Sequence, residues 1–113
     1  MKLVAISIIF FSFGSTICSA DSIEGLWKRP NGILVNIANC GKSFCVSAAS
    51  GPHNGGKAGT FQPDGRGGYI GRLTDLETGK TYDGKGIVRG NSATLSGCIF
   101  FGLLCQSETW ARQ

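Results

Sequence analysis

Glycine places the strongest limit on what this chain can fold into. Eighteen of the 113 residues are glycine, and all but Gly14 lie after residue 20. Each glycine inside a helix costs about 1 kcal/mol relative to alanine, so this density disfavours long helices. Between the glycines, apolar and polar residues alternate with the period of two that is typical of half-buried strands. The sequence therefore predicts an all-β domain and excludes a helical bundle or a coiled coil.

The first 20 residues have the anatomy of a secretory signal peptide. One charged residue opens the segment, an apolar run covers residues 3–13, and a small-residue exit ends at Ala20. A transmembrane helix takes about 20 apolar residues, so this run is too short to span a bilayer, and no second run follows. We expect cleavage before Asp21, secretion into the bacterial periplasm, and a single domain over residues 21–113.

Four cysteines follow the signal segment, and an even number in a small exported domain predicts two disulfides. We favour the local pairs Cys40–Cys45 and Cys98–Cys105, because each brackets a short segment with turn character. A long Cys40–Cys98 bridge would stabilise more, but it would form less easily. Zinc ligands usually come at tighter spacings than C-x4-C and C-x6-C, so we predict no metal site.

Turn signals divide the domain into seven or eight short strands. Pro30-Asn31-Gly32 and Pro63-Asp64-Gly65 are two of these signals. The candidate strands are 23–28, 33–38, 44–49, 60–62, 69–73, 81–89, 92–99 and 105–112. Consecutive strands should pair antiparallel, and closing the sheet removes its exposed edges. We predict a small antiparallel meander barrel, with a flattened sandwich as the nearest alternative.

The last strand can bury either of its faces. Gln106, Glu108 and Trp110 share one face, so an inward Trp110 brings Glu108 with it. A buried carboxylate needs a partner, for which Arg72 or Arg112 is available. An outward Trp110 would instead leave a small, polar interior wall. We favour the inward orientation.

Three segments together resemble one known family. They are Gly25-Leu26-Trp27, the stretch LETGKTY at 76–82, and an ending in which Gly97-Cys98 and a second cysteine precede Thr109-Trp110-Ala111-Arg112. This pattern resembles the DUF2147 family of small exported bacterial proteins, over nearly all of the chain after the signal segment. The resemblance implies export and a β-fold, and it implies no biochemical activity.

The early Gly-x-Trp is also similar to that of calycins, the lipocalin and avidin type of barrel. In such barrels the tryptophan packs at the closed end near an arginine from a late strand, roles that the likeness gives to Gly25, Trp27 and Arg112. The cation–π contact would be worth about 0.5–2 kcal/mol. Bacterial metalloprotease inhibitors share this compact barrel, so inhibition of a protease or lysozyme is an alternative role by analogy.

Aromatic residues supply the first candidate binding site. Trp27, Tyr69, Tyr82 and Trp110, with Arg112, could line a small pocket for an apolar ligand. The competing interpretation is core packing, since a domain this small needs its aromatic residues for the interior.

The hairpin tip between Cys98 and Cys105 is the second candidate. Hairpin tips are normally polar, yet residues 99–104 are all apolar or glycine. One interpretation is that the tip folds over a barrel end as a plug. The other leaves Phe100, Phe101 and Leu103 exposed on a clamped loop that contacts an envelope protein or a membrane surface.

No group of residues in the sequence favours catalysis. His53 is the only histidine, and its glycine-rich loop would hold a general base poorly. Most of the acidic residues lie at predicted turns, where they serve local backbone bonding. Basic residues are scattered singly, unlike the stripe that is typical of nucleic-acid binding. We therefore predict a non-catalytic protein without a cofactor, whose partner is a small apolar ligand or an envelope protein and not a nucleic acid.

Overall fold

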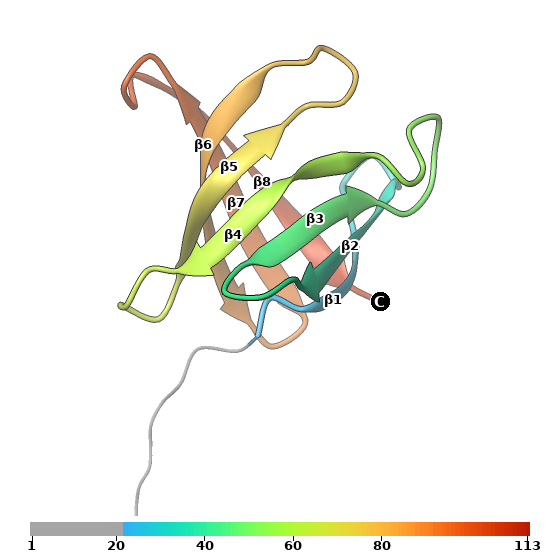
Figure 1. The fold of residues 1–113 in the computed structure, drawn as a ribbon, viewed down its shortest axis with the longest axis horizontal. Coiled ribbons are helices and arrows are strands. Elements are labelled where there is room, and N and C mark those ends of the chain that lie inside the picture. The colour runs from blue at the N-terminus through green and yellow to red at the C-terminus, as the bar shows by residue number, and fades with distance from the viewer. Residues whose placement is uncertain (1–21) are drawn as a thin grey trace, which may run out of the picture.

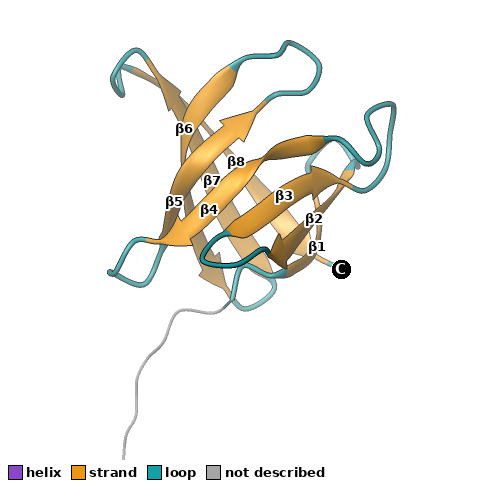
Figure 2. Ribbon diagram, viewed as in Figure 1, coloured by secondary structure: helices purple, strands orange, loops and turns teal. Residues whose placement is uncertain are grey.

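A computed structural model describes residues 22–113, so the expected signal segment lies outside the described residues. Eight antiparallel strands follow one another around a closed barrel, in chain order (Figure 1). Loops join the strands, and the described residues contain no helix (Figure 2). The strands are β1 (Gly25–Lys28), β2 (Leu34–Asn39), β3 (Phe44–Ala48), β4 (Lys57–Pro63), β5 (Tyr69–Thr74), β6 (Thr81–Arg89), β7 (Ser92–Ile99) and β8 (Leu104–Arg112). The predicted meander barrel is confirmed.

Strand β4 is longer than the sequence pattern indicates. It begins at Lys57, whereas the alternation predicts a short strand over 60–62. Val46 pairs with Gly59 and Ser47 pairs with Lys57, which leaves Ala58 as an extra residue in a β-bulge. A bulge breaks the two-residue alternation, so it conceals the start of the strand from a pattern search.

The loops alternate between two ends of the barrel, because each strand reverses the direction of the one before it. Ser22, Gln113 and the loops 40–43, 64–68 and 90–91 gather at one end, which we call the closed end. The loops 29–33, 49–56, 75–80 and 100–103 gather at the other, which we call the open end. Loops far apart in the sequence therefore meet at each end.

Apolar packing fills the closed end. Trp27 and Ile23 are completely buried, and the Trp27 indole N–H donates to the carbonyl of Ile23 at 2.9 Å. The Arg112 guanidinium lies over the Trp27 ring, 4.3 Å from its centroid. It also donates to the carbonyls of Glu24 and Ser22, at 2.8 and 2.9 Å. These hydrogen bonds hold the segment before β1 across the barrel end, and the predicted contact between Arg112 and Trp27 is present.

Gly25 is required where this segment enters the barrel. Its φ of +134° lies outside the range that side-chain-bearing residues favour, and a Cβ there would lie 3.0 Å from Nη1 of Arg112.

Inside the barrel, inward-facing apolar side chains from all eight strands contribute to the buried core. The core members on β2 to β8 are Val35, Ile37, Val46, Phe61, Tyr69, Val88, Ala93, Leu95 and Trp110.

The two disulfides lie at opposite ends of the barrel. Cys40–Cys45 closes the turn between β2 and β3 at the closed end. Cys98–Cys105 joins directly opposed residues of β7 and β8 near the open end. Both predicted local pairings are confirmed.

Candidate functional site

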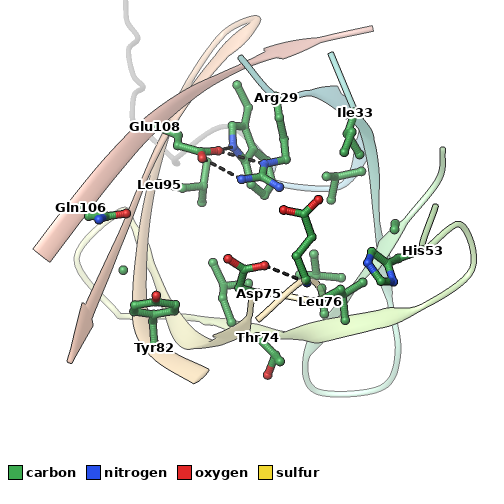
Figure 3. Close-up of a pocket in the computed structure, with 18 of the residues that line it drawn as sticks. Arg29, Ile33, His53, Thr74, Asp75, Leu76, Tyr82, Leu95, Gln106 and Glu108 are labelled. Atoms are coloured by element: carbon green, nitrogen blue, oxygen red, sulfur yellow. Dashed lines mark hydrogen bonds and ion pairs between the residues drawn. The ribbon is translucent and has the colours of Figure 1, made fainter. Parts of the chain in front are cut away.

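The half of the barrel towards the open end is hollow. It contains a cavity of about 230 Å³, and Figure 3 shows side chains that line it. The walls of its lower part, on the side of Trp110, are apolar. Val35, Val46, Leu73 and Leu95 form part of these walls, and Trp110 is the lining residue of β8 nearest the closed end. Pockets for drug-sized ligands are larger, about 300–1,000 Å³. This cavity therefore suits a small molecule.

An ion pair lies on one wall of the cavity. Nε of Arg29 donates to Oε1 of Glu108 at 2.9 Å, and Nη2 donates to Oε2 at 2.7 Å. The indole N–H of Trp110 also donates to Oε1, at 2.8 Å. Both carboxylate oxygens are therefore engaged, and Glu108 joins the first loop of the barrel to its last strand.

The inward orientation of Trp110 is confirmed, because this residue is only 6% exposed. The predicted partner of Glu108, Arg72 or Arg112, is wrong, since Arg29 fills that role. Barrel closure pairs Lys28 with Ala111, which brings the next residue, Arg29, to the mouth beside Glu108. Arg112 is engaged at the closed end instead.

Arg29 and Glu108 each favour the ionised form of the other. The hydrogen bonds from Arg29 lower the pKa of Glu108 below its ordinary value; partial burial opposes this shift, and the bond from Trp110 supports it. The same contact with Glu108 raises the pKa of Arg29, and the nearby carboxylates of Asp75 and Glu77 add to the effect. Both members of the pair therefore stay ionised at neutral pH.

Polar groups from three loops surround the mouth. Arg29 comes from the loop after β1, His53 from the loop after β3, and Asp75 and Glu77 from the loop after β5. Oδ1 of Asp75 accepts the backbone N–H of Glu77 at 2.9 Å, which fixes the local turn. Figure 3 shows Arg29, His53 and Asp75 around one opening.

The sequence interpretation described these loop residues only in part. His53 is exposed on its loop, and Asp75 is a turn residue, as predicted. What the interpretation missed is that both line one cavity. The signal was present, because loops that follow odd-numbered strands of a meander barrel must all lie at the same end.

The structure divides the five predicted pocket residues between the two ends. Tyr82 and Trp110 line the cavity. Trp27 and Arg112 pack against each other at the closed end. Tyr69 is also there, 7% exposed, with its hydroxyl accepting the N–H of Ile23 at 3.3 Å.

The apolar hairpin tip projects beyond the barrel rim. Phe101 is fully exposed, Leu103 is 81% exposed and Phe100 is 64% exposed. The plug interpretation is therefore wrong. The ladder between β7 and β8 continues to Ile99 and Leu104, whereas β6 pairs with β7 only as far as Cys98. This extra length carries the tip past the rim (Figure 1).

The backbone of the tip is strained. Phe100 and Phe101 have φ values of +53° and +55°, in the left-handed region. Residues with side chains pay about 1–2 kcal/mol each for this conformation. The turn thus presents two aromatic side chains to solvent at an energetic cost, with Cys98–Cys105 at its base.

Neither a metal-binding group nor a membrane-spanning helix is found in residues 22–113. No group of three or more His, Cys, Asp and Glu side chains in this stretch is placed to hold a metal ion. Nor does this part of the chain contain a helix long and apolar enough to cross a membrane.

One family model matches the sequence. It is described as "Uncharacterized protein conserved in bacteria (DUF2147)" and covers residues 56–112. The matched region contains the 76–82 stretch, Gly97-Cys98 and the ending at Arg112, which are most of the segments that carry the resemblance. No curated protein sequence and no solved structure matches the chain.

Proposed function

Since the chain belongs to the DUF2147 family of bacterial proteins, whose description gives no activity, we propose a function from the cavity: non-catalytic binding of a small, largely apolar ligand. The hollow half of the barrel is the observation that carries this proposal. A small domain buries only a small apolar core. Side chains that border an empty volume also lose stabilising van der Waals contacts. An open cavity beside a fully packed core is best explained by an occupant.

The chemistry of the lining supports binding over catalysis. Glu108, the one lining carboxylate that comes from a strand, has both oxygens held by Arg29 and Trp110. His53 is exposed on a glycine-rich loop, and no hydrogen bond from the described residues orients its side chain. A general base needs a fixed position close to the group it deprotonates.

Export to the periplasm belongs to the same proposal, and the two disulfides support it because such bonds persist in oxidising compartments.

Native mass spectrometry of the protein purified from its own host tests the proposal. We expect a retained small molecule, which the Ala48→Leu variant should lose because Ala48 lines the cavity. Phenethyl alcohol, added to the ligand-free protein, should change the fluorescence of Trp110 in a Trp27→Phe background. Ligand binding would be contradicted if the host-purified protein has the mass of the polypeptide alone and the alcohol does not change the fluorescence of Trp110.

A second candidate function is protein binding through the tip, including inhibition of a periplasmic protease or lysozyme. Its specific support is the exposure of Phe101 and Leu103 on a strained turn at the disulfide-clamped end of a hairpin. A preorganised apolar loop loses little entropy when it enters a partner's groove. This function would be supported if a hydrolase co-purifies with the protein but not with the Phe100→Ser/Phe101→Ser variant. The thermal stability of the variant should be unchanged. Capture that survives the double substitution would exclude the tip as the contact.

A further inference from the structure

The charge around the cavity has the opposite sign to that of the whole chain. The sequence contains 11 Lys and Arg residues against seven Asp and Glu residues. The residues that line the cavity nevertheless include three carboxylates, Asp75, Glu77 and Glu108, against one arginine and no lysine. The lining also contains one histidine, His53. The mouth is therefore an acidic site on a basic protein.

Pairing leaves two of these three carboxylates without a cation. Arg29 and Glu108 neutralise each other through two hydrogen bonds. This contact is the one ion pair within residues 22–113, so neither Asp75 nor Glu77 is paired with a basic side chain in that stretch. Asp75 accepts one backbone N–H, which satisfies one oxygen and leaves its charge. The unpaired charge at the mouth is negative.

The lower part of the cavity requires a different chemistry from its ligand. Its walls are apolar and include the aromatic ring of Trp110, whereas Tyr82, the second residue of β6, lines the cavity near the open end. A cavity of about 230 Å³ holds roughly eight groups the size of water, at about 30 Å³ each. An occupant that satisfies both regions is a small molecule with an apolar body and one cationic end.

We propose that the cavity takes a small organic amine. Its aromatic or short aliphatic body lies against Trp110, and its ammonium group lies beside Asp75 and Glu77. This inference rests on the proposed function, because it concerns the same cavity. Apolar walls around a mouth of one sign concentrate the field there, which favours the entry of a cation.

A carboxylate ligand fits the same site poorly. Arg29 is the one Lys or Arg residue in the lining, and two of its nitrogen atoms already donate to Glu108. An anion would have to compete with Glu108 for the guanidinium while lying close to two further carboxylates. The geometry therefore separates amines from fatty acids and other anionic ligands of similar size.

Calorimetric titration with three probes of matched body tests the inference. The probes are phenethylamine, phenethyl alcohol and hydrocinnamate, which are a cation, a neutral molecule and an anion near neutral pH. We expect the amine to bind roughly tenfold more tightly than the alcohol at low salt, and the anion to bind more weakly than either. Added salt should reduce the preference for the amine without changing the affinity for the alcohol.

The variant Asp75→Asn/Glu77→Gln should lower the affinity for the amine to that for the alcohol. The Asp75→Asn change keeps the acceptor oxygen that holds the turn. Asp83→Asn is the control, since it removes one carboxylate charge from an exposed position on β6 that is not part of the cavity lining. This control should leave the affinity for the amine unchanged. The salt titration of the unmodified protein gives the same test without any substitution.

The outcomes separate this inference from the proposed function. If the alcohol or hydrocinnamate binds as tightly as the amine, or more tightly, the preference for a cation is wrong while ligand binding stands. If none of the three probes binds and the host-purified protein carries no small molecule, the proposed function fails and this inference fails with it.

Discussion

The two ends of the barrel are built from the same kind of hairpin but treat their interior differently. At the closed end, Trp27 and Ile23 are completely buried, and the guanidinium of Arg112 covers the Trp27 ring. At the open end, Trp110 borders a cavity of about 230 Å³. The comparison teaches that complete packing is needed at only one end. The anchored end supplies stability, and the other end is free to stay hollow.

The arginines of the two ends show the same division. Arg112 donates to the carbonyls of Glu24 and Ser22, so it closes the backbone of the N-terminal segment over the barrel. Arg29 instead donates to a carboxylate on the last strand and stays at the cavity wall. Arg112 thus anchors the N-terminal segment, whereas Arg29 neutralises Glu108 at the mouth.

The largest expected effect comes from truncating the tryptophan of the closed end. Trp27→Ala should lower the free energy of unfolding by about 3–5 kcal/mol, because the ring is completely buried. Trp110→Ala should cost at least about 1 kcal/mol less, since part of that ring faces the cavity and has fewer packing contacts to lose. Urea denaturation followed by circular dichroism measures both. Equal losses would show that the two ends are packed alike.

Enlarging one alanine at each end is the next test of the comparison. Ala93 is 1% exposed within the packed half, so Ala93→Leu should destabilise the fold by about 1–3 kcal/mol. Ala48 lines the cavity, so Ala48→Leu has room and should change stability by less than about 0.5 kcal/mol. Thermal unfolding of the two variants checks this. A large loss at Ala48 would mean that the hollow is not open to a side chain.

Acid should weaken the open end through Glu108. Its pKa is lowered in the folded protein, so the stabilisation by Arg29 is present above the unfolded pKa, about 4.3, and is lost as the pH falls through the folded value. The partial exposure of the pair screens it, so we expect Glu108→Gln to cost only about 0.5–1 kcal/mol at neutral pH. Melting temperatures of the variant and the parent should converge as the pH falls below the lowered pKa of Glu108 in the folded protein. A difference that persists in acid would contradict an ionic origin.

The smallest effect is expected at the hairpin tip. Phe101 is fully exposed, so Phe101→Ser should change the free energy of unfolding by no more than about 0.5 kcal/mol. Chemical denaturation provides the measurement. A loss above about 1 kcal/mol would mean that the tip packs on the barrel in solution, contrary to its place in the fold.

The sequence was sufficient for most of the fold, because its signals are local. Alternation and turn residues predicted the strands that follow Gly32, Gly79 and Gly90, and turn character predicted both disulfides. The one strand whose start was missed, β4, contains the bulge at Ala58. A bulge is a local exception to the period on which the prediction depends.

The candidate site was less accessible to sequence reasoning, because it depends on closure of the barrel. Arg29 and Glu108 are 79 positions apart, and only the pairing of β1 with β8 brings them together. The aromatic residues were expected to share one pocket, yet Trp27 and Trp110 belong to different halves of the interior. Alternation tells which side chains face inward and not how far along the barrel axis they lie.

The placement of the first and last described residues has a practical consequence. Ser22 and Gln113 both lie at the closed end, away from Asp75 and Glu77. A tether attached at Gln113 would therefore immobilise the barrel on a sensor surface with its mouth displayed to the solution. Measurements on captured protein would then report the accessible cavity, whereas a tether placed in any loop of the opposite end would obstruct it.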